Sequence, residues 1–266
     1  MTTKPLMKPL ILVTNDDGVN APGIRAVAAA LRELGDVVIA APDRERSAAS
    51  HALTLDKPLR VDELEPGVFS IDGTPADCSY LALLHLVSRR PALCVSGINH
   101  GYNLGSDVFY SGTVAGAVEA VLRGVPAIAV SQDRAAGADF AHAAAFVRAL
   151  AAEALARGEG AIPPASLLNV NLPRGASMSY QVTFLGRRVY RDQVDVRQDL
   201  RGRSYYWIGG PEENATDVPG SDCSAVRAGL VSVTPLGLDL THAGLLAELG
   251  AWRVGSFVQA AVEHAK

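Results

Sequence analysis

Two adjacent carboxylates follow the first apolar run of the chain, in the segment Asn15-Asp16-Asp17-Gly18. Carboxylate oxygens are hard ligands that suit Mg²⁺, Mn²⁺ or Ca²⁺. Asn, Asp and Gly are also common in tight turns and at helix starts, so these residue types alone leave an ordinary turn open. The position of Asp16 and Asp17 at the end of the first apolar run favours a functional site.

Two neutral oxygen donors follow later apolar runs. Ser47 ends the segment Ala41–Ser47 and offers a hydroxyl at the sheet edge where Asp16 is expected. Asn99 lies in a stretch rich in Gly and Asn, and it could supply a carbonyl oxygen to a cation. The structural alternatives are a helix cap or turn for Ser47 and a left-handed turn for Asn99.

The segment Tyr110–Gly116 places hydroxyls and glycines before a helical pattern. The start of a helix binds anions because its N–H groups and its dipole both point at the ligand. Simple N-capping by Ser111 or Thr113 is the alternative. The segment lacks the GK[ST] of a P-loop, yet a phosphate could bind here.

Other kinds of site are disfavoured by spacing. No GxGxxG follows the first apolar run, which argues against a dinucleotide-binding domain. A haloacid-dehalogenase-type phosphatase would place two aspartates two residues apart, whereas Asp16 and Asp17 are adjacent. The histidines show no spacing typical of zinc ligation, and only His100 lies in a candidate loop, where it is a candidate substrate contact.

The elements that must position these residues alternate between strand and helix. Five apolar runs are expected to form buried strands: Pro9–Thr14, Val37–Ala41, Ala92–Ser96, Ala127–Ser131 and Leu167–Asn171. Helical patterns lie between them: Gly23–Leu34, Ala76–Val87, Thr113–Arg123 and Asp139–Arg157. The alternation predicts an α/β fold with a mainly parallel sheet and helices on both faces. Ligands of such sheets bind beyond the carboxyl ends of the strands, where the candidate residues fall.

The pattern changes after about Pro173. Strands are expected at Tyr180–Leu185, Ser204–Ile208 and Leu230–Thr234, and short helices at Gly244–Leu249 and Arg253–His264. We interpret residues 1–266 as a single domain, with a core over about 8–180 and a projecting β-hairpin arm and tail over about 181–266. The arginines of the arm alternate with aspartates, which is typical of a solvated or subunit-contacting surface. The aromatic run Tyr205–Trp207 is more typical of packing than of base stacking, so we expect it to contact a neighbouring subunit.

Composition narrows the function classes further. The chain has 266 residues, 48% hydrophobic and 20% charged, with a formal net charge of −4. This balance excludes a disordered chain and disfavours nucleic-acid polymers and anionic membranes as partners. Cys78, Cys94 and Cys223 are widely spaced, which suits small buried residues in a reducing compartment. No stretch reaches the roughly 18–20 apolar residues of a membrane span, and we expect a cytoplasmic protein.

Seven segments in order make the chain resemble one family. They are TNDDGVNAPG, APDRERSAAS, IDGTPADC, VSGINHGYNLGSDVFYSGTVAGA, PAIAVS, YWIGG and VSVTPLGLDLT, between Leu10 and about Thr241. Together they are similar to the stationary-phase survival protein SurE family of nucleotidases. The resemblance implies a Rossmann-like three-layer core, and dimers or tetramers with exchanged C-terminal elements. It departs modestly from the family pattern at His100, Tyr102 and Ser106.

The resemblance also implies an activity and a cofactor. The activity is a metal-dependent phosphatase of nucleoside 5′-monophosphates, extending to 3′-monophosphates and polyphosphate. The cofactor is one divalent cation per subunit, bound by residues matching Asp16, Asp17, Ser47 and Asn99.

The residue types agree with this, since an all-oxygen set favours Mg²⁺ or Mn²⁺. Asp16 and Asp17 are the expected catalytic residues. The expected phosphate contacts are Asn103, Ser111, Gly112 and Thr113. Two alternatives remain: a phosphatase of a non-nucleotide phosphomonoester, and a non-catalytic nucleotide-binding module.

Overall fold

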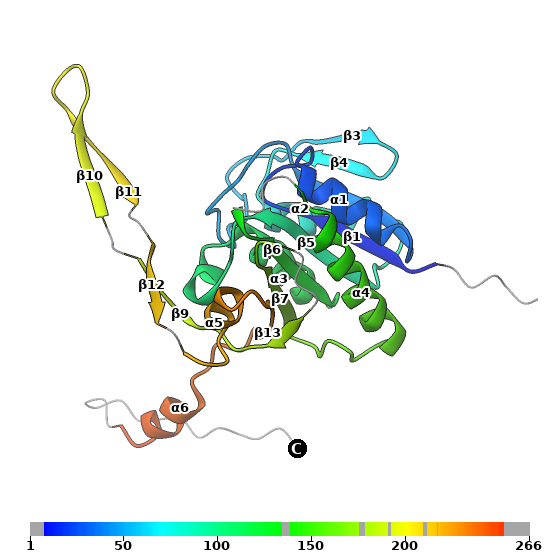
Figure 1. Ribbon diagram of the computed structural model, residues 1–266. Coiled ribbons are helices and arrows are strands. Elements are labelled where there is room, and N and C mark those ends of the chain that lie inside the picture. The colour runs from blue at the N-terminus through cyan, green and yellow to red at the C-terminus, as the bar shows by residue number, and fades with distance from the viewer. Residues whose placement is uncertain are drawn as a thin grey trace, which may run out of the picture.

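The computed structural model describes residues 8–134, 139–175, 179–190, 193–209, 212–216 and 218–252. Its centre is a nine-stranded sheet with the order β3-β4-β2-β1-β5-β6-β7-β13-β8 (Figure 1). The strands are β1 (Leu10–Thr14), β2 (Asp36–Pro42), β3 (Val61–Glu65), β4 (Val68–Ile71), β5 (Leu93–His100), β6 (Ala127–Gln132), β7 (Ser166–Leu172), β8 (Tyr180–Val182) and β13 (Val231–Gly237). From β4 to β7 all neighbours are parallel, whereas β3 and β13 pair antiparallel with β4 and β7. The prediction of a mainly parallel sheet is confirmed.

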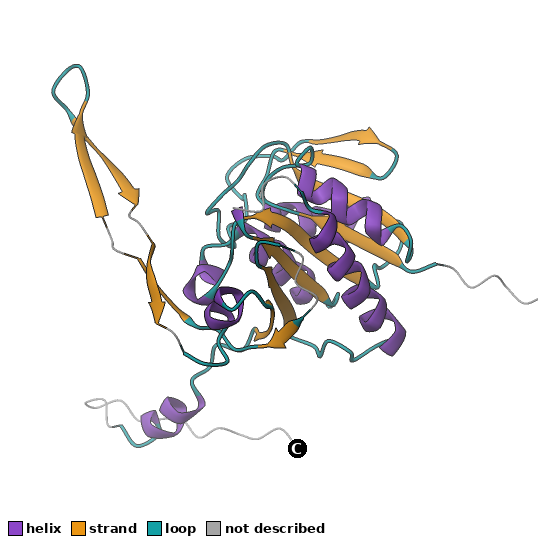
Figure 2. Cartoon of the chain, viewed as in Figure 1, coloured by secondary structure: helices purple, strands orange, loops and turns teal. Residues whose placement is uncertain are grey.

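Helices cover both faces of this sheet (Figure 2). One face packs against α1 (Pro22–Leu31) and α4 (Ala141–Arg157), and the other against α2 (Pro75–Leu81) and α3 (Gly112–Leu122). Successive side chains of a strand point to opposite faces, so Ile11 and Val13 join the first cluster and Leu12 joins the second. The result is the three-layer, Rossmann-like core that was expected.

The second predicted helix is shorter than its pattern suggests. Residues 76–87 were expected to form one helix, but α2 ends at Leu81 and the chain continues as a π-helical turn over Ala82–Leu86. The Val87 N–H bonds to the Ala82 carbonyl at 3.0 Å, five residues back, and so widens the last turn.

One strand of the C-terminal region belongs to the core. β13 pairs with β7, and its Val231 and Val233 are buried in the cluster under α1 and α4. The helix α5 (Asp222–Arg227) precedes it. The sheet therefore includes residues from beyond position 180, because the chain returns to the core after forming the arm.

The arm consists of two antiparallel strand pairs that extend away from the core (Figure 1). The pair nearer the core joins β9 (Arg187–Tyr190) to β12 (Glu212–Thr216), and the outer pair joins β10 (Gln193–Gln198) to β11 (Ser204–Gly209). Apolar side chains are exposed along the outer pair: Val194, Val196, Tyr205, Tyr206, Trp207 and Ile208. The tail contains α6 (Ala243–Leu249), and the predicted helix Arg253–His264 lies outside the described residues.

The three cysteines behave as expected for small core residues. Cys78, Cys94 and Cys223 are all buried and none forms a disulfide. Within the described part of the chain, no helix has the length and apolarity needed to cross a membrane.

Candidate functional site

An open cleft of about 1500 Å³ lies beyond the carboxyl ends of the parallel strands. Its lining includes six of the expected metal and phosphate contacts, Asp16, Asp17, Ser47, Asn99, Asn103 and Ser111, together with the candidate substrate contact His100. They come from the loop after β1, the loop after β2, the end of β5 and the segment that precedes α3. The topology therefore brings together residues that lie almost a hundred positions apart in the chain.

Asp16 lies against the start of α3, and only 5% of its surface is exposed. Burial raises the pKa of its carboxyl to about 6, and the neighbouring charge of Asp17 acts in the same direction. A hydrogen bond from the Thr113 hydroxyl to Asp16 Oδ1 opposes this shift by stabilising the charged form. The fold thus holds a carboxylate where its negative charge is disfavoured, as is common at sites that use the charge.

This burial predicts a stability effect that depends on pH. The folded-state pKa of Asp16 is about 6 and the ordinary value is 3.8, so the folded protein retains the proton more strongly. The stability that the protonated Asp16 carboxyl contributes is present at pH 4 and is lost as the pH rises through 6. The free energy of unfolding falls by about 3 kcal/mol in total over this range. In EDTA at pH 7, we expect the free energy of unfolding of Asp16→Asn to be higher than that of the wild type by about this amount.

Denaturant unfolding between pH 4 and pH 7.5 measures the difference. The two proteins should approach each other in unfolding free energy near pH 4, where the wild-type carboxyl is protonated as well. A difference that stays constant across this range would show that the Asp16 charge is not the cause.

Asp17 is more accessible and is held by the main chain. Burial raises the pKa of its carboxyl, and the charge of Glu45 adds to the shift. The His100 N–H donates to Asp17 Oδ2 at 3.2 Å, which acts in the opposite direction. The His100 ring lies 3.2 Å from the Arg134 carbonyl and edge-on to Phe140, so the residue meets Asp17 through its backbone.

Ser47 is exposed in the cleft and has a partner that the sequence analysis missed. Its hydroxyl donates to Glu45 Oε1 at 2.6 Å, which leaves the lone pairs of Ser47 Oγ as possible ligands. The preceding residue, Arg46, donates its N–H to the Asp16 carbonyl at 2.7 Å. This bond places Ser47 beside the two aspartates. Glu45 could have been identified from the sequence only by its position two residues from Ser47.

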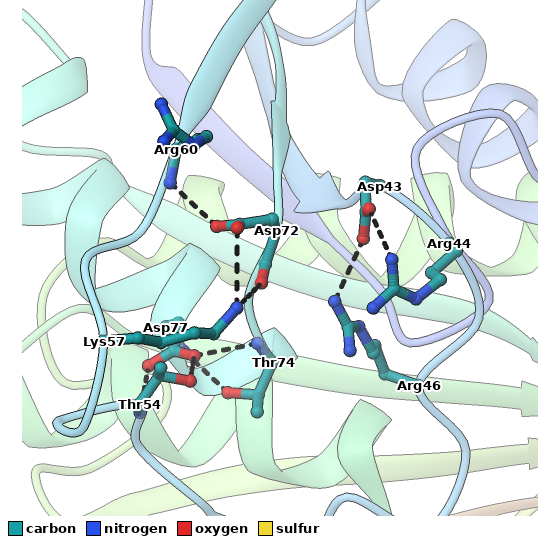
Figure 3. A network of polar contacts seen from close by, with 9 residues as sticks. All are labelled: Asp43, Arg44, Arg46, Thr54, Lys57, Arg60, Asp72, Thr74 and Asp77. Carbon is teal, nitrogen blue, oxygen red and sulfur yellow. Dashed lines mark hydrogen bonds and ion pairs between the residues drawn. The ribbon is translucent and has the colours of Figure 1, made fainter.

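The loop that carries Ser47 is fastened at both ends (Figure 3). At its start, Asp43 accepts hydrogen bonds from Arg44 and Arg46. Further on, the main-chain N–H and hydroxyl of Thr54 donate to the buried Asp77 of α2, at 2.9 and 2.6 Å. Figure 3 shows that Thr74 contacts the same carboxylate, and its N–H donates at 2.8 Å. Contacts with α2 therefore anchor the far end of the loop that carries Ser47.

Asn99 is directed by an irregularity in β5. The register between β5 and β6 shifts between Ser96 and Asn99, and Gly97 has a φ of +137°. A Cβ at Gly97 would lie 2.3 Å from the Val130 carbonyl oxygen, so only glycine fits this close approach. The Asn99 amide nitrogen donates to the Gly101 carbonyl at 2.7 Å, which leaves its Oδ1 as the remaining ligand atom.

The start of α3 faces the aspartates. Ser111 is the N-cap, and its hydroxyl oxygen accepts from the Val114 N–H at 3.1 Å. Helical N–H groups of the first turn have no carbonyl partner within the helix, so those of Gly112 and Thr113 begin the anion-attracting end. Ser111 therefore caps the helix, as the structural alternative predicted, and it also lines the cleft.

Thr113 and Gly112 have different surroundings from those the sequence suggested. Thr113 is fully buried, its hydroxyl is bonded to Asp16, and its main-chain N–H also stabilises the charged form of that carboxyl, so a phosphate contact from this residue would share the N–H with Asp16. A Cβ at Gly112 would lie 2.9 Å from Asp16 Cβ and 3.1 Å from Asp16 Oδ2. Gly112 therefore allows the helix start to approach the carboxylate.

The base of the arm forms another wall of the cleft. Arg187 and Arg188 belong to the Arg-rich stretch interpreted as solvated surface, yet both line the cleft. Arg188 forms an ion pair with Asp107 in the 3₁₀ helix η2 (Gly105–Phe109). The fully buried Asp222 accepts from the N–H groups of Gly105 at 2.8 Å and Gly186 at 2.7 Å. These bonds join the arm to the loop that precedes α3.

The donor set can be tested against a bound cation. Among the described residues, no group of three or more His, Cys, Asp or Glu is placed to hold a metal ion. A site here must therefore add neutral oxygens to its carboxylates, and Ser47 and Asn99 line the same cleft as Asp16 and Asp17. Two carboxylates, a hydroxyl and an amide oxygen fit Mg²⁺ or Mn²⁺ and do not fit a Cys or His zinc site.

Fold and site together define a Rossmann-like α/β protein in which a buried carboxylate meets a helix start in an open, oxygen-rich cleft. The chain belongs to the survival protein SurE family, whose model matches residues 11–192. The family resemblance seen in the motifs is confirmed.

Individual relatives cover nearly the whole chain. The 5′-nucleotidase SurE of Myxococcus xanthus is 51% identical over 260 residues, which make up 97% of each protein. That of Geobacter metallireducens is 50% identical over 91% of this chain and 96% of its own. The crystal structure of the SurE protein from Aquifex aeolicus gives a TM-score of 0.80 at 39% identity, and covers 91% of this chain and 98% of that chain.

Proposed function

We propose that this protein is a 5′-nucleotidase that hydrolyses nucleoside monophosphates to nucleoside and phosphate. The observation that carries the proposal is the meeting of Asp16 with the start of α3 in a large cleft, where a phosphate would find both N–H donors and a cation site. The substrate class is supported by the relatives, which are named 5′-nucleotidases. Activity on 3′-monophosphates and polyphosphate is part of the same proposal.

A divalent cation, Mg²⁺ or Mn²⁺, is proposed as the cofactor, with Asp16, Asp17, Ser47 and Asn99 as its ligands. When bound, it would polarise the phosphoryl group and activate a water molecule. A cation would also relieve the cost of ionising Asp16. We therefore expect Mg²⁺ to raise the melting temperature of the wild type at pH 7.5 and to have little effect on Asp16→Asn.

The protein's own residues bind and orient the phosphate. The N–H groups of Gly112 and Thr113 begin a helix whose dipole favours negative charge, and charge-assisted hydrogen bonds strengthen as charge builds on the phosphoryl oxygens. The Asn103 amide and the Ser111 hydroxyl line the same cleft and complete the proposed set of phosphate contacts. Thr113 orients Asp16 by its hydroxyl, and the His100 N–H orients Asp17. Phosphoryl transfer needs mainly such positioning and charge.

A phosphate-release assay tests the function. The panel contains nucleoside 5′- and 3′-monophosphates of several bases, sugar phosphates and polyphosphate, each with EDTA, Mg²⁺ or Mn²⁺. We expect release from nucleoside 5′-monophosphates only with added metal. Faster release from sugar phosphates would favour the phosphomonoesterase alternative. Tight nucleotide binding without release at any metal would favour the non-catalytic module.

Assembly is expected to cover the arm. The side chains of Tyr206, Trp207 and Ile208 are 63%, 62% and 91% exposed, which is costly for an isolated chain. We propose a homodimer or homotetramer in which the arm packs on a neighbour and C-terminal elements are exchanged. Sedimentation at micromolar concentration should give at least a dimer. A fully active monomer would contradict this expectation.

The proposed substrate and the unpaired thiols support a proposal for the compartment. We place the protein in the cytoplasm, where free nucleotides are available and where three unpaired cysteines are stable. The net charge of −4 offers no electrostatic attraction to a nucleic-acid backbone, and no polymer of nucleic acid is proposed as a partner.

A further inference from the structure

A stripe of buried polar side chains crosses the sheet beneath α3, near the cleft. Leu167 packs in the apolar cluster on this face, and side chains two and four residues further along β7 share its direction. Those residues are Asn169 and Asn171, and both are fully buried. Across the sheet, Ser131 of β6 and Ser232 of β13 stand beside Asn171 in register. The strand end is thus polar where its sequence run suggested an apolar core.

The two β7 asparagines bind the main chain of Asn103 on both sides. Asn171 Oδ1 accepts from the Asn103 N–H at 2.8 Å, and its amide nitrogen donates to the Asn103 carbonyl at 3.1 Å. Asn169 donates to the same carbonyl at 2.9 Å. Asn103 lies 66 and 68 residues before these partners, in the loop between β5 and η2. One residue of an irregular loop therefore has its backbone fixed by a regular strand.

The side chain of Asn103 is fixed by a neighbouring strand. Its amide nitrogen donates to Ser131 Oγ at 2.7 Å. An amide nitrogen carries two hydrogens, and this bond uses one of them. Asn103 is 93% buried by these contacts and still contributes to the lining of the cleft. Its carboxamide is consequently held at one orientation at the wall where the phosphate is proposed to bind.

We propose that Asn171, supported by Asn169, is a positioning residue for phosphate binding that acts through Asn103. The proposal rests on the function proposed above. Buried amides are costly unless they are hydrogen-bonded, and these two direct their bonds to one loop residue. A preorganised donor is worth more to a charged ligand than a mobile one, because no ordering is needed when the ligand binds. Asn171 contributes an acceptor and a donor to Asn103, whereas Asn169 contributes one donor.

The experiment compares Asn171→Ala, Asn169→Ala and Ser232→Ala. Inorganic phosphate is titrated calorimetrically in the presence of Mg²⁺, and its competitive inhibition constant is measured with a nucleoside 5′-monophosphate. We expect Asn171→Ala to weaken phosphate binding by at least about tenfold and Asn169→Ala by less, because Asn171 still holds the carbonyl. The Mg²⁺ concentration for half-maximal activity should stay within about twofold, since Asp16, Asp17 and Ser47 lie on other loops and Asn99 is held by its own bond to Gly101.

Ser232→Ala is the matched control. Ser232 is fully buried beside Asn171 in the sheet, and its Oγ has no hydrogen-bond partner among the described residues. Its removal should leave phosphate binding unchanged. If Asn171→Ala does not fold, Ser131→Ala tests the fixed orientation of the Asn103 carboxamide, because it frees the Asn103 amide without altering β7. Unchanged phosphate binding by this variant would overturn the inference.

A double-mutant cycle separates this inference from the proposed function. In an Asn103→Ala background, Asn171→Ala should cause little further loss of phosphate affinity. An equal further loss, or wild-type affinity in folded Asn171→Ala, would overturn the positioning role. If Asn103→Ala itself binds phosphate normally, the proposed phosphate contact fails together with the inference. If phosphate binds as expected but no nucleotide is hydrolysed, only the proposed function fails.

Discussion

Asp16→Asn and Asp17→Asn should each lower nucleotide turnover by at least ~10²-fold, because each removes one negative charge from the proposed cation site while preserving side-chain size. Loss of folding is not the expected cause. Asp16 is a carboxylate whose charge is disfavoured by burial, so its neutral replacement should not weaken the fold at neutral pH. The measurement is phosphate release by purified, EDTA-treated protein supplied with Mg²⁺ or Mn²⁺.

A matched control for this prediction is Asp36→Asn. Asp36 is the first residue of β2, its partner is Arg89, and it does not line the cleft. This variant should retain most of its activity, because only an exposed ion pair is lost. Near-wild-type hydrolysis by either Asp16→Asn or Asp17→Asn would remove the basis for the proposed site.

Gly112→Val should abolish most of the activity through two effects. Its side chain would obstruct the helix start where the phosphate is proposed to bind. The structure adds a second effect, because even a Cβ at this position would lie 2.9 Å from Asp16 Cβ and 3.1 Å from Pro75 Cγ. From the sequence, Gly112 and the metal ligands lie on separate loops, and a bulky residue at 112 would be expected to spare the metal. The structure argues against that expectation, because a Cβ at 112 would crowd Asp16 itself.

Two further variants show how much of the lost activity comes from the bulk added at position 112. Thr113→Ala removes only the hydroxyl bonded to Asp16, and it should cost about 1–3 kcal/mol in kcat/KM because the main-chain donors remain. Gly237→Val is the control for added bulk, because a Cβ there would have no atom within 4 Å. Activity assays and Mg²⁺-dependent melting temperatures should both be altered in Gly112→Val. Normal hydrolysis by this variant would mean that the segment is only a capped turn.

The sheet was predictable because its signal is local. The runs from Pro9–Thr14 to Leu167–Asn171 are short and apolar, and helical patterns lie between them, which is sufficient for a parallel α/β core. The position of β13 was not predictable in the same way. Its run, Leu230–Thr234, was recognised as a strand, but which neighbour it pairs with depends on how the chain returns from the arm.

The sequence predicted which residues belong to the candidate site better than it predicted their hydrogen-bond partners. Asp16, Ser47 and Asn99 follow strands, and the topology rule places such residues at one edge. Contacts between residues far apart in the chain produce no periodic pattern in the sequence. Nothing in the run Leu167–Asn171 indicates that its asparagines bind Asn103, and nothing near Thr113 indicates that its hydroxyl belongs to Asp16. Those pairings arise only when separate loops meet.

The burial of Asp16 has an evolutionary consequence. A residue that weakens the metal-free fold at neutral pH is retained only while selection acts on catalysis. Laboratory evolution that selects for heat resistance alone should therefore accumulate neutral residues at position 16, and the enzymatic activity should be lost. Any search for a more robust form of this protein needs an activity readout in every round, because one route to greater stability passes through the site itself.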